Sequence, residues 1–479
     1  MRIKDKIYID LRELGNSFTE LCDLFTYPNP EYYERQKMKL SIKNIKPHIF
    51  HYRIAAENGN QTLILPRGGL SKVQEFYARK NIYHRVLDER IDKPQIDVNL
   101  NASTVLEDQQ HTMIDLLYNN VGGLVEAPCG SGKSIGILGF IDKIKQPTLI
   151  MMAEHRLRSQ WEQEVKERLC GSFTFGRYDG DKHVEGDIVI GLVQTVHRMI
   201  DEDPHCLDKF GAIIIDESHK VSADTFLKVI NNCPAKYRVG VTGTVERKDG
   251  MHLLSYDVLG PCLMSIQENT LKHRITSFDY IIVNTNIQEE LPTVKMWNGR
   301  GRETKVSITE AITKLTENEQ RNMIILSNIV DNINDGYFPL TISDRVEHAR
   351  SLYAHLTELG FKGVLLIGAT RKKTDWSLIR KDSTVQFIIA QSSIAAEGLD
   401  MPRLSALHLT CPSSNLPKLK QKIGRIRRIC EGKKDPMVYD YVDNQAYYIN
   451  DKGNTINIFK GGAFKRIKFY KQLQLEYEE

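Results

Sequence analysis

The 479-residue sequence has few cysteines, only three tryptophans and no long hydrophobic run. Its eight cysteines never fall at CxxC spacing, so neighbouring cysteines supply neither a zinc site nor a redox pair. No apolar stretch approaches the ~20 residues that a membrane helix needs. The first residues, MRIKDKIYIDLREL, lack the apolar core of a signal peptide. We therefore expect a soluble protein with reduced thiols, cytoplasmic in a bacterium or a phage-infected host, with no membrane partner.

A large excess of one charge is also missing. Lys and Arg total 65 against 61 Asp and Glu, which is a formal net charge of +4. The two ends carry the surplus, because residues 1–100 hold 17 basic and 13 acidic side chains and residues 413–479 hold 14 and 8. The residues between them are therefore net acidic. The small net charge by itself does not indicate a nucleic-acid partner. The basic surplus at the two ends of the chain is nevertheless compatible with one.

The sequence does contain an alternation of short apolar runs and longer amphipathic segments. Runs such as PTLIMMA, GDIVIGLV, FGAIIIDE and VQFIIAQ are typical of strands buried on both faces. The alternation predicts an α/β fold of two parallel sheets wrapped by helices, over residues 96–268 and 269–445. Residues 1–95 are expected to form a small α+β domain, and residues 446–479 a basic C-terminal extension. The polar segment 287–309 is expected to be a loop or insertion near the second unit.

The strongest local signal is APCGSGKS, which follows the run GGLVE and precedes a helical segment. Small residues between a strand and a helix let consecutive backbone N–H groups point at phosphate oxygens. Lys133 is expected to reach the β- and γ-phosphates of ATP, and the Ser134 hydroxyl to ligate Mg²⁺. Ala127 stands where the usual pattern has glycine, and it is small enough for the same turn. The predicted ATP-binding residues of this loop are Ala127, Pro128, Cys129, Gly130, Ser131, Gly132, Lys133 and Ser134.

The second signal is DESH, residues 216–219, directly after an apolar run. A carboxylate at the carboxyl end of a strand can hold Mg²⁺, and its neighbour can polarise the attacking water. We assign the metal to Asp216 and the catalytic role to Glu217. The motif is expected on the strand that neighbours the phosphate-loop strand. The residues expected to couple this site to the rest of the domain are His219, Thr242, Gly243 and Thr244.

The motifs GSGKS, DESH, TGT and QKIGRIRR occur in the order found in superfamily 2 helicases and translocases, which the chain resembles over residues 97–445. The resemblance implies two RecA-like domains with ATP in a cleft between them. It also implies that Arg425 and Arg428 join Lys133 and Glu217 as catalytic residues, by stabilising charge on the transferred phosphoryl group. Further nucleotide contacts implied by position are Gln110, Gly398, Asp400 and Gln421. The segment from His155 to Trp161 is implied to bind the nucleic-acid strand, and the implied contacts are His155, Arg156, Gln194, Thr195, Ser343 and Arg345.

Within the superfamily, TGTVERKDG (residues 242–250) resembles the T-A-T-P-x-R-x-D-G signature of DNA-directed helicases related to XPB and to phage recombination helicases of the UvsW type. That resemblance implies a nucleic-acid contact by Arg247. The sequences NPEYYERQKMK and LPRGG resemble the accessory domain of compact phage and bacterial members. There Arg35 and Lys37 are expected to bind phosphates, while neighbouring tyrosines stack on bases. A solvated surface over an ordinary aromatic core is the alternative.

The sequence therefore predicts an ATP hydrolase that uses Mg²⁺ and couples hydrolysis to movement on DNA. Its expected work is to remodel forked or branched DNA in recombination, repair or replication. The expected partners are DNA, duplex, forked or branched with single-stranded regions, and replication or recombination proteins. Three alternatives stay open: an RNA helicase, the motor subunit of a multi-chain restriction system, and a binding scaffold without catalysis. The sequence predicts neither the polarity of movement nor the oligomeric state.

Overall fold

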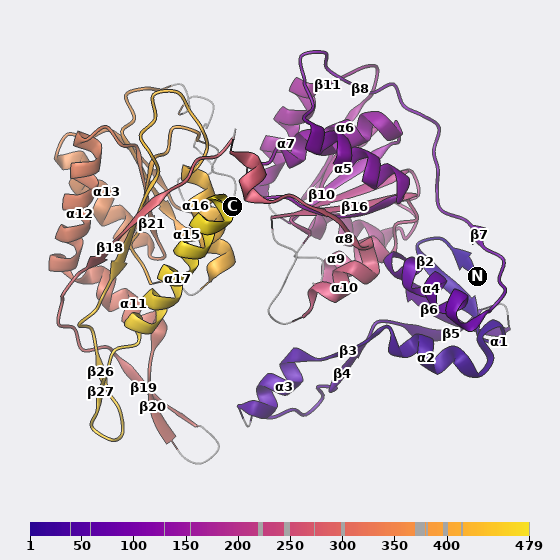
Figure 1. Cartoon of the computed structure of the whole chain (residues 1–479), viewed down its shortest axis with the longest axis horizontal. Coiled ribbons are helices and arrows are strands. Elements are labelled where there is room, and N and C mark those ends of the chain that lie inside the picture. The colour runs from indigo at the N-terminus through magenta and orange to yellow at the C-terminus, as the bar shows by residue number, and fades with distance from the viewer. Residues whose placement is uncertain are drawn as a thin grey trace. The chain divides into compact units, whose positions relative to one another are not determined.

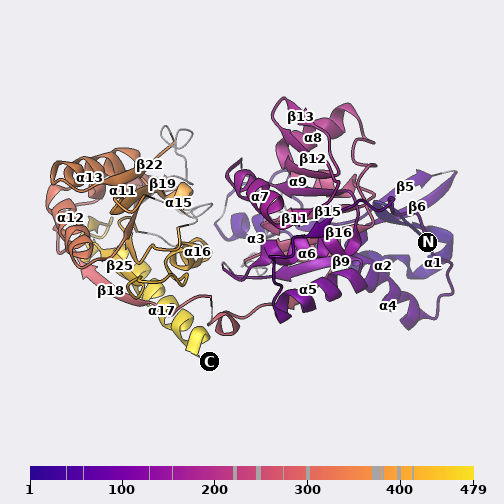
Figure 2. The same cartoon turned by 90° about the horizontal axis from the view of Figure 1, so that it is seen from above.

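The chain contains two compact units, Met1–Ile266 and Gln267–Glu479 (Figures 1 and 2). The computed structural model describes residues 1–38, 40–57, 59–128, 130–153, 155–218, 224–243, 250–272, 274–297, 302–368, 379, 382–395, 401–412 and 415–478. Within these residues, no helix combines the length and the apolar composition needed to cross a membrane. Each unit is described by itself below.

The N-terminal region has its own antiparallel-rich sheet and its own core. The strand order is β5-β6-β2-β1-β7, with β1 (Arg2–Ile3), β2 (Lys6–Asp10), β5 (Arg53–Glu57), β6 (Asn60–Pro66) and β7 (Leu87–Asp88). The helices are α1 (Leu11–Leu14), α2 (Phe18–Asp23) and α4 (Leu70–Lys80). Ile7 and Ile9 of β2 are fully buried, while the residues between them are half-buried, because side chains alternate between the two faces of a strand. Val73 and Phe76 of α4 cover that face and complete the core.

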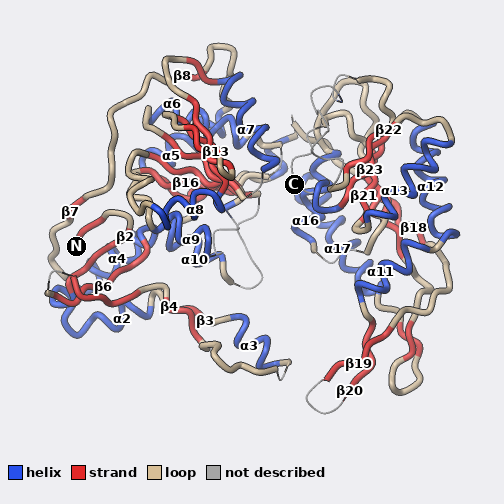
Figure 3. The backbone as a smooth tube through the Cα atoms, turned by 180° about the vertical axis from the view of Figure 1, so that it is seen from behind, coloured by secondary structure: helices blue, strands red, loops and turns tan. Residues whose placement is uncertain are grey.

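A narrow arm extends from this region (Figure 3). None of its described residues, 26–38 and 40–50, is buried. It consists of β3 (Thr26–Pro28), α3 (Pro30–Lys37) and β4 (His48–Phe50). Asn29 caps α3 by accepting a hydrogen bond from the backbone N–H of Glu31 at 3.1 Å, and Pro30 occupies the first turn, where its missing N–H has no consequence. No residue of α3 is buried.

The first α/β sheet has eight strands in the order β13-β12-β14-β10-β15-β16-β9-β17. All pair in parallel except β13, and the central strands are buried on both faces, as the continuous apolar runs predicted. The strands are β9 (Gly122–Glu126), β10 (Thr148–Met152), β12 (Phe175–Asp179), β13 (Lys182–Val184), β14 (Ile188–Leu192), β15 (Ala212–Asp216), β16 (Tyr237–Thr242) and β17 (Cys262–Ser265), with β8 (Asn99–Leu100) and β11 (Leu169–Cys170) as a separate pair. The helices are α5 (Asp108–Asn119), α6 (Lys133–Ile144), α7 (His155–Arg168), α8 (Val193–Glu202), α9 (Asp224–Asn231) and α10 (His252–Leu259).

The strand order corrects one prediction. The DESH strand β15 was expected beside the phosphate-loop strand β9, but β16 lies between them. Strand order is decided by the long crossovers of a parallel sheet, and the spacing of two motifs along the chain does not report it.

The LPRGG sequence docks the N-terminal region onto this sheet. Arg67 is 6% exposed and donates hydrogen bonds to the carbonyl oxygens of Lys4 at 3.0 Å and Ala235 at 2.7 Å. Its pKa is lowered, chiefly by burial. Gly68 lies against the end of α10, where a Cβ atom would come within 2.3 Å of Gly260 N. Glycine is required here by close backbone approach, so the motif serves domain docking.

A buried carboxylate fixes the base of the arm to the same helix. Asp257 of α10 is fully buried and accepts hydrogen bonds from the Tyr27 hydroxyl at 2.7 Å and Lys72 Nζ at 2.6 Å. His51 Nδ1 lies 3.0 Å from the same carboxylate. Three side chains of the N-terminal region therefore converge on one carboxyl group of α10, and the arm is held at its root.

The second unit contains a six-stranded, all-parallel sheet in the order β18-β25-β24-β21-β23-β22. Its strands are β18 (Asp279–Asn284), β21 (Pro339–Ser343), β22 (Gly363–Leu366), β23 (Phe387–Gln391), β24 (Ala406–Leu409) and β25 (Met437–Val442). Its helices are α11 (Ile308–Glu317), α12 (Glu319–Asn334), α13 (Val346–Glu358), α15 (Ser392–Ala395), α16 (Leu416–Ile426) and α17 (Phe459–Glu478). Along β23, Ile388 and Ala390 join the core under α16 and α17, while Phe387 and Ile389 join the core under α12 and α13. The sheet is thus covered on both faces.

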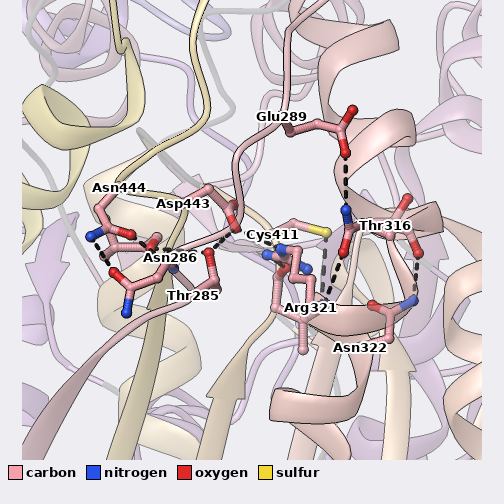
Figure 4. A network of polar contacts seen from close by, with 12 residues as sticks. Thr285, Asn286, Glu289, Thr316, Arg321, Asn322, Cys411, Asp443 and Asn444 are labelled. Atoms are coloured by element: carbon pink, nitrogen blue, oxygen red, sulfur yellow. Dashed lines mark hydrogen bonds and ion pairs between the residues drawn. The ribbon is translucent and has the colours of Figure 1, made fainter.

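A buried polar network ties α12 to the ends of three strands (Figure 4). Arg321 and Asp443 are both fully buried, and Arg321 Nε donates to Asp443 Oδ1 at 2.8 Å. Arg321 also donates to the carbonyl oxygen of Thr410 at 2.6 Å, and the Thr285 hydroxyl donates to Asp443 at 2.9 Å. Buried ion pairs of this kind contribute geometric definition more reliably than stability, since desolvation offsets their attraction.

One segment of this unit differs from the prediction. The segment 287–309, expected to be a loop, contains the antiparallel hairpin β19 (Thr293–Trp297) and β20 (Arg302–Val306). A second hairpin, β26 (Tyr448–Ile449) and β27 (Thr455–Ile456), braces it, because Asp451 accepts hydrogen bonds from the backbone N–H and the hydroxyl of Thr304 at 2.7 and 2.6 Å. In β19 polar and apolar residues alternate over Thr293–Met296, but Val294 and Met296 are both exposed, so the strand has no buried face there.

The basic C-terminal segment is mostly the helix α17. Tyr470 and Leu473 pack into the core of the second unit. Arg466, one of the basic residues of this segment, is buried and forms a two-fold hydrogen-bonded ion pair with Asp440 at 2.7 and 2.8 Å. This arginine holds the helix on the sheet and does not face a partner. The lysines on the exposed side of the helix are Lys460, Lys465, Lys468 and Lys471.

Candidate nucleotide and nucleic-acid sites

The phosphate loop connects β9 to α6, as predicted. Gly130 and Gly132 have φ values of 90° and 73°, which belong to the left-handed region that glycine adopts without strain. The Ala127 backbone N–H donates to the carbonyl oxygen of Thr242 at 2.8 Å, so the loop begins against the end of β16. The Ser131 hydroxyl is buried and has no hydrogen-bond partner among the described residues. An orphaned buried donor beside a glycine-rich turn at a helix N-terminus fits a bound phosphate group. Cys129 lies outside the described residues.

Lys133 and the two acidic residues meet at one point. Lys133 Nζ lies 3.5 Å from Glu217 Oε1 and 4.0 Å from Asp216 Oδ1. Asp216, the last residue of β15, is 5% exposed, and its pKa is raised chiefly by burial, against the opposing effect of Lys133. Ser134 follows Lys133 in the first turn of α6. Among the described residues, no group of three or more His, Cys, Asp and Glu side chains could hold a metal ion.

Glu217 has a strained backbone. Its φ of 56° is in the left-handed region, which non-glycine residues seldom adopt. Strain of this kind persists only where the surroundings enforce it, and it concentrates at functional sites. Here it turns the Glu217 side chain towards Lys133 immediately after the strand ends.

Gln110 lies beside the phosphate loop. Its side-chain amide donates to the carbonyl oxygen of Gly132 at 3.0 Å, and its Oε1 accepts from the backbone N–H of Glu107 at 2.9 Å in a capping box at the start of α5. The side chain is 2% exposed, so in this structure it braces the loop. Thr242 is buried at the end of β16, and Gly243 follows it next to Ala127. The other predicted coupling residues, His219 and Thr244, lie outside the described residues, as does Arg247.

The predicted nucleic-acid residues of the first unit are divided between surface and interior. His155 and Arg156 begin α7, but their side chains lie outside the described part of the structure. Gln194 is exposed at the start of α8. Thr195 is 2% exposed, and its hydroxyl accepts from the backbone N–H of Gly180 at 3.0 Å. The Thr195 side chain is therefore committed to the fold, and Gln194 is the one of the pair that faces outward.

Trp161 is a site residue whose role the sequence reasoning missed. It was expected to belong to a strand-binding segment, but its indole N–H donates to Asp216 Oδ2 at 2.9 Å. Trp161 is 2% exposed. Nothing in the local sequence links these residues, which are 55 positions apart.

In the second unit, Ser343 and Arg345 are held by neighbouring side chains. Ser343 is fully buried, and its hydroxyl bonds to His348 Nδ1 at 3.0 Å and accepts from the backbone N–H of Arg345 at 3.1 Å. Arg345 donates to the Thr313 hydroxyl at 2.9 Å and to the carbonyl oxygen of Thr309 at 2.7 Å. The Ser343 hydroxyl is therefore used inside the domain, and the nucleic-acid contact predicted for this residue stays a prediction.

The segment QKIGRIRR begins on α16. Asn415 caps this helix by accepting from the backbone N–H of Lys418 at 3.1 Å. Gln421 and Arg425 are half-buried on the helix. Arg428 lies just after the end of the helix, where its backbone forms an isolated antiparallel β-bridge with Ile275. The remaining nucleotide contacts predicted in this unit, Gly398 and Asp400, lie outside the described residues.

Among the basic residues of the N-terminal arm, Lys37 is exposed and Arg35 is half-buried. Arg35 pairs with Glu31 at 2.8 Å.

Comparisons with known proteins agree with this arrangement. Residues 91–247 match the family described as "Type III restriction enzyme, res subunit", and residues 305–430 match "Helicase conserved C-terminal domain". The chain is 26% identical to "Probable helicase D10" of Escherichia phage T5 over 401 residues, which cover 81% of this chain and 82% of the relative. It is 28% identical to "DNA 3'-5' helicase XPB" of Mycobacterium tuberculosis over 162 residues, which cover 33% of this chain and 29% of the relative.

The chain also resembles a solved structure. The structure of a single-residue variant of S. cerevisiae Dbp5, bound to RNA and ADP BeF3, aligns with 76% of this chain and 86% of that one, at 13% identity and a TM-score of 0.53. At that identity the likeness supports the fold alone. The matches to the two helicase families together span more than half of the chain. The chain therefore belongs to the superfamily 2 helicases, with two RecA-like domains, and it is an ATP-hydrolysing helicase.

Proposed function

We propose that this helicase acts on DNA and remodels forked or branched DNA in recombination, repair or replication. The observation that carries the proposal is the segment TGTVERKDG, which resembles the signature of DNA-directed members of the superfamily, with Gly243 in place of alanine and Val245 in place of proline. The likeness to a relative named as a DNA 3'-5' helicase, over 162 residues, supports the same choice. A phage relative that covers most of the chain supports action in the cytosol of a bacterial or phage-infected cell.

The N-terminal arm supports a nucleic-acid partner. Tyr33 is 45% exposed and Phe50 is 49% exposed, and no described residue of the arm is buried. Lys46 Nζ lies 6.0 Å from the centre of the Phe50 ring, so a cation stands beside an open aromatic face. Exposed aromatics interleaved with basic side chains suit stacking on unpaired bases with phosphates neutralised alongside. Lys37 adds a further exposed basic side chain to the arm.

The nucleotide site supports a phosphoryl-transfer mechanism built from this chain's own groups. Backbone N–H groups of the phosphate loop and Lys133 would bind the β- and γ-phosphates, and Glu217 would orient the attacking water. Mg²⁺, which Ser134 and Asp216 would hold together with phosphate oxygens, supplies charge neutralisation at the transferred group. Arg425 and Arg428, which the resemblance implies as catalytic residues, would stabilise the charge on the transferred phosphoryl group.

One comparison tests this proposal. ATP hydrolysis is measured without nucleic acid and with single-stranded DNA, duplex DNA, a four-way junction and RNA, each at the same salt concentration because phosphate contacts are salt-dependent. We expect stimulation by DNA, with the largest effect from forked or four-way substrates. Stimulation by RNA alone would refute the choice of DNA, and equal stimulation by linear and branched DNA would refute branch remodelling.

A further inference from the structure

The hydrogen bond between Trp161 and Asp216 joins the segment expected to bind nucleic acid to the predicted nucleotide site. Trp161 lies on α7, six residues after His155, which is about 9 Å along a helix. Its indole N–H reaches the carboxylate at the end of β15, in the nucleotide site, at 2.9 Å. The start of α7 is the segment assigned to the nucleic-acid strand, so one rigid helix spans from that strand contact to the nucleotide carboxylate.

The bond determines how the carboxylate is presented. Asp216 Oδ1 accepts the backbone N–H of Glu217 at 3.0 Å and lies 4.0 Å from Lys133 Nζ. Asp216 Oδ2 accepts the indole N–H. Each carboxylate oxygen of Asp216 therefore accepts one hydrogen bond, and the residue is only 5% exposed. The orientation of the carboxylate plane thus depends on Trp161 as much as on the backbone N–H of Glu217.

An indole suits this position for an electrostatic reason. Its N–H is a donor with no acceptor capacity and no charge. A lysine or arginine at the same place would neutralise the carboxylate and repel a divalent cation, whereas the indole fixes the carboxylate's orientation and leaves its negative charge available. A glutamine would bring an acceptor oxygen beside the anion.

Ion pairs stiffen α7 along its own length, and one of them also joins it to β12. Arg158 pairs with Glu162 at 3.2 Å, one turn along the helix, and with Asp179 at the end of β12. Arg168 pairs with Glu164 near the other end. A shift at the start of the helix is therefore expected to move Trp161 with the whole segment rather than to be absorbed by bending.

We propose that Trp161 is a positioning residue that holds Asp216 in the orientation for binding Mg·nucleotide and transmits the state of the nucleic-acid segment of α7 to that carboxylate. The transmission rests on the proposed function, because it requires nucleic acid at the start of α7. The positioning does not, because it concerns nucleotide binding alone.

The first test measures Mg·ADP affinity by calorimetry without nucleic acid. Trp161→Phe removes the N–H donor and keeps an aromatic ring, and we expect its affinity to fall about tenfold, because removing the hydrogen-bond partner of a metal-binding carboxylate typically weakens metal binding by this much or more. Trp161→His places a ring N–H in the position of the pyrrole half of the indole, and we expect it to recover most of the affinity where the imidazole is neutral. Thermal unfolding is measured alongside, and we expect each variant to unfold within a few degrees of the parent. Unchanged affinity in a folded Trp161→Phe protein would overturn the proposal, and so would equal losses in the Phe and His variants, which would assign Trp161 to packing.

The second test uses the indole itself as the reporter. The chain has two other tryptophans, Trp297 and Trp376, so replacing both with Phe leaves Trp161 as the sole source of tryptophan fluorescence. We expect its emission to change on addition of Mg²⁺ with ADP, because the charge of its hydrogen-bond acceptor is then compensated. An emission spectrum indifferent to Mg²⁺ with ADP, at concentrations that calorimetry shows to be saturating, would contradict the contact.

The third test addresses transmission. ATP turnover of Trp161→Phe is compared with and without the nucleic acid that stimulates the parent protein most, at saturating Mg·ATP. We expect the stimulation ratio to fall about three- to tenfold, beyond any effect on the unstimulated rate. A preserved ratio would refute transmission and leave positioning intact. A parent protein stimulated by RNA alone would refute the proposed function, while the affinity and fluorescence tests would still decide the role of Trp161.

Discussion

Lys422 Nζ donates a hydrogen bond of 2.7 Å to Ser392 Oγ and thereby joins α16 to α15 in the second unit. Lys422 belongs to QKIGRIRR, and Ser392 begins the segment SSIAAEGLD. The lysine is 5% exposed, and its pKa is lowered chiefly by burial. A buried ammonium with a neutral hydroxyl as acceptor costs stability rather than adding to it. The residue is therefore expected to position α16, which carries Arg425.

Replacing this lysine separates positioning from stability. Lys422→Met fills similar volume without a charge, so we expect unfolding to be unchanged or stabilised by about 1 kcal/mol. Maximal ATP turnover should nevertheless fall several-fold, because α16 loses its hydrogen bond to α15. Lys418→Met, on the exposed side of the same helix, is the matched control and should leave turnover unchanged. A Lys422→Met protein with lower stability and full turnover would contradict this interpretation.

Lys133→Ala tests the nucleotide site directly. The substitution removes the cation that faces Glu217 and Asp216 at 3.5 and 4.0 Å. We expect ATP turnover to fall by at least about 100-fold, the loss typical of removing one transition-state contact, while nucleotide-free binding of DNA is largely kept. Steady-state hydrolysis and fluorescence anisotropy of labelled DNA measure the two effects. Undiminished turnover would be incompatible with the site described above.

Arg428→Ala tests the second unit's contribution to hydrolysis. A cation that stabilises only the transferring phosphoryl group affects turnover more than ground-state binding. We expect nucleotide affinity within a few-fold of the parent and a loss of turnover on the order of 10³-fold. Equilibrium binding of ADP and single-turnover hydrolysis separate these quantities. A parallel loss of affinity and turnover would instead place Arg428 in ground-state binding.

Val121 offers a stability prediction. This β-branched residue has a φ of 58° in the turn between α5 and β9, a conformation that costs a non-glycine residue about 1–2 kcal/mol. Val121→Gly removes that strain at a smaller cost in unfolded-state entropy, so we expect net stabilisation of about 0.5–1 kcal/mol, seen as a higher unfolding temperature. Val105→Gly is the control, because Val105 is 82% exposed and does not have a positive φ. That control should be neutral or destabilising.

Two buried histidines predict sensitivity to acid in the second unit. Burial lowers the pKa of His348 to about 3 and that of His408 to about 3. Both are therefore neutral in the folded protein at pH 5, whereas in the unfolded chain they take up a proton below pH ~6.5. The unfolded state then binds more protons, so stability falls as pH drops from about 7 to 5, by about 2 kcal/mol for each histidine. Denaturant unfolding at several pH values measures this loss, which His348→Gln should reduce by about half.

The fold class and much of the nucleotide site could be predicted from residues close together in the chain. Continuous apolar runs predicted fully buried parallel strands, and the structure confirms them in both sheets. Small residues before Lys133 predicted the strand–loop–helix, because left-handed backbone at Gly130 and Gly132 is a local requirement. Both signals act over a few residues, which is why a sequence pattern carries them.

Contacts between distant segments required the tertiary structure. The position of β16 between β15 and β9, the docking role of Arg67 and the pairing of Arg466 with Asp440 depend on which crossovers and helices pack together. The sequence does not show whether a basic side chain binds a phosphate group or a buried carboxylate. Ser343 was likewise assigned by position, and only its burial shows that its hydroxyl is used inside the domain.

The ordered motifs determined from the sequence alone that the chain is an ATP-hydrolysing helicase. The tertiary structure decided how that chemistry is held. Trp161 and Asp216 are 55 residues apart, yet they meet at 2.9 Å because α7 packs beside the strand that ends in the carboxylate. Local sequence sets the conformation of a few residues, whereas the choice of hydrogen-bond partner is made only when burial brings distant polar groups together without water.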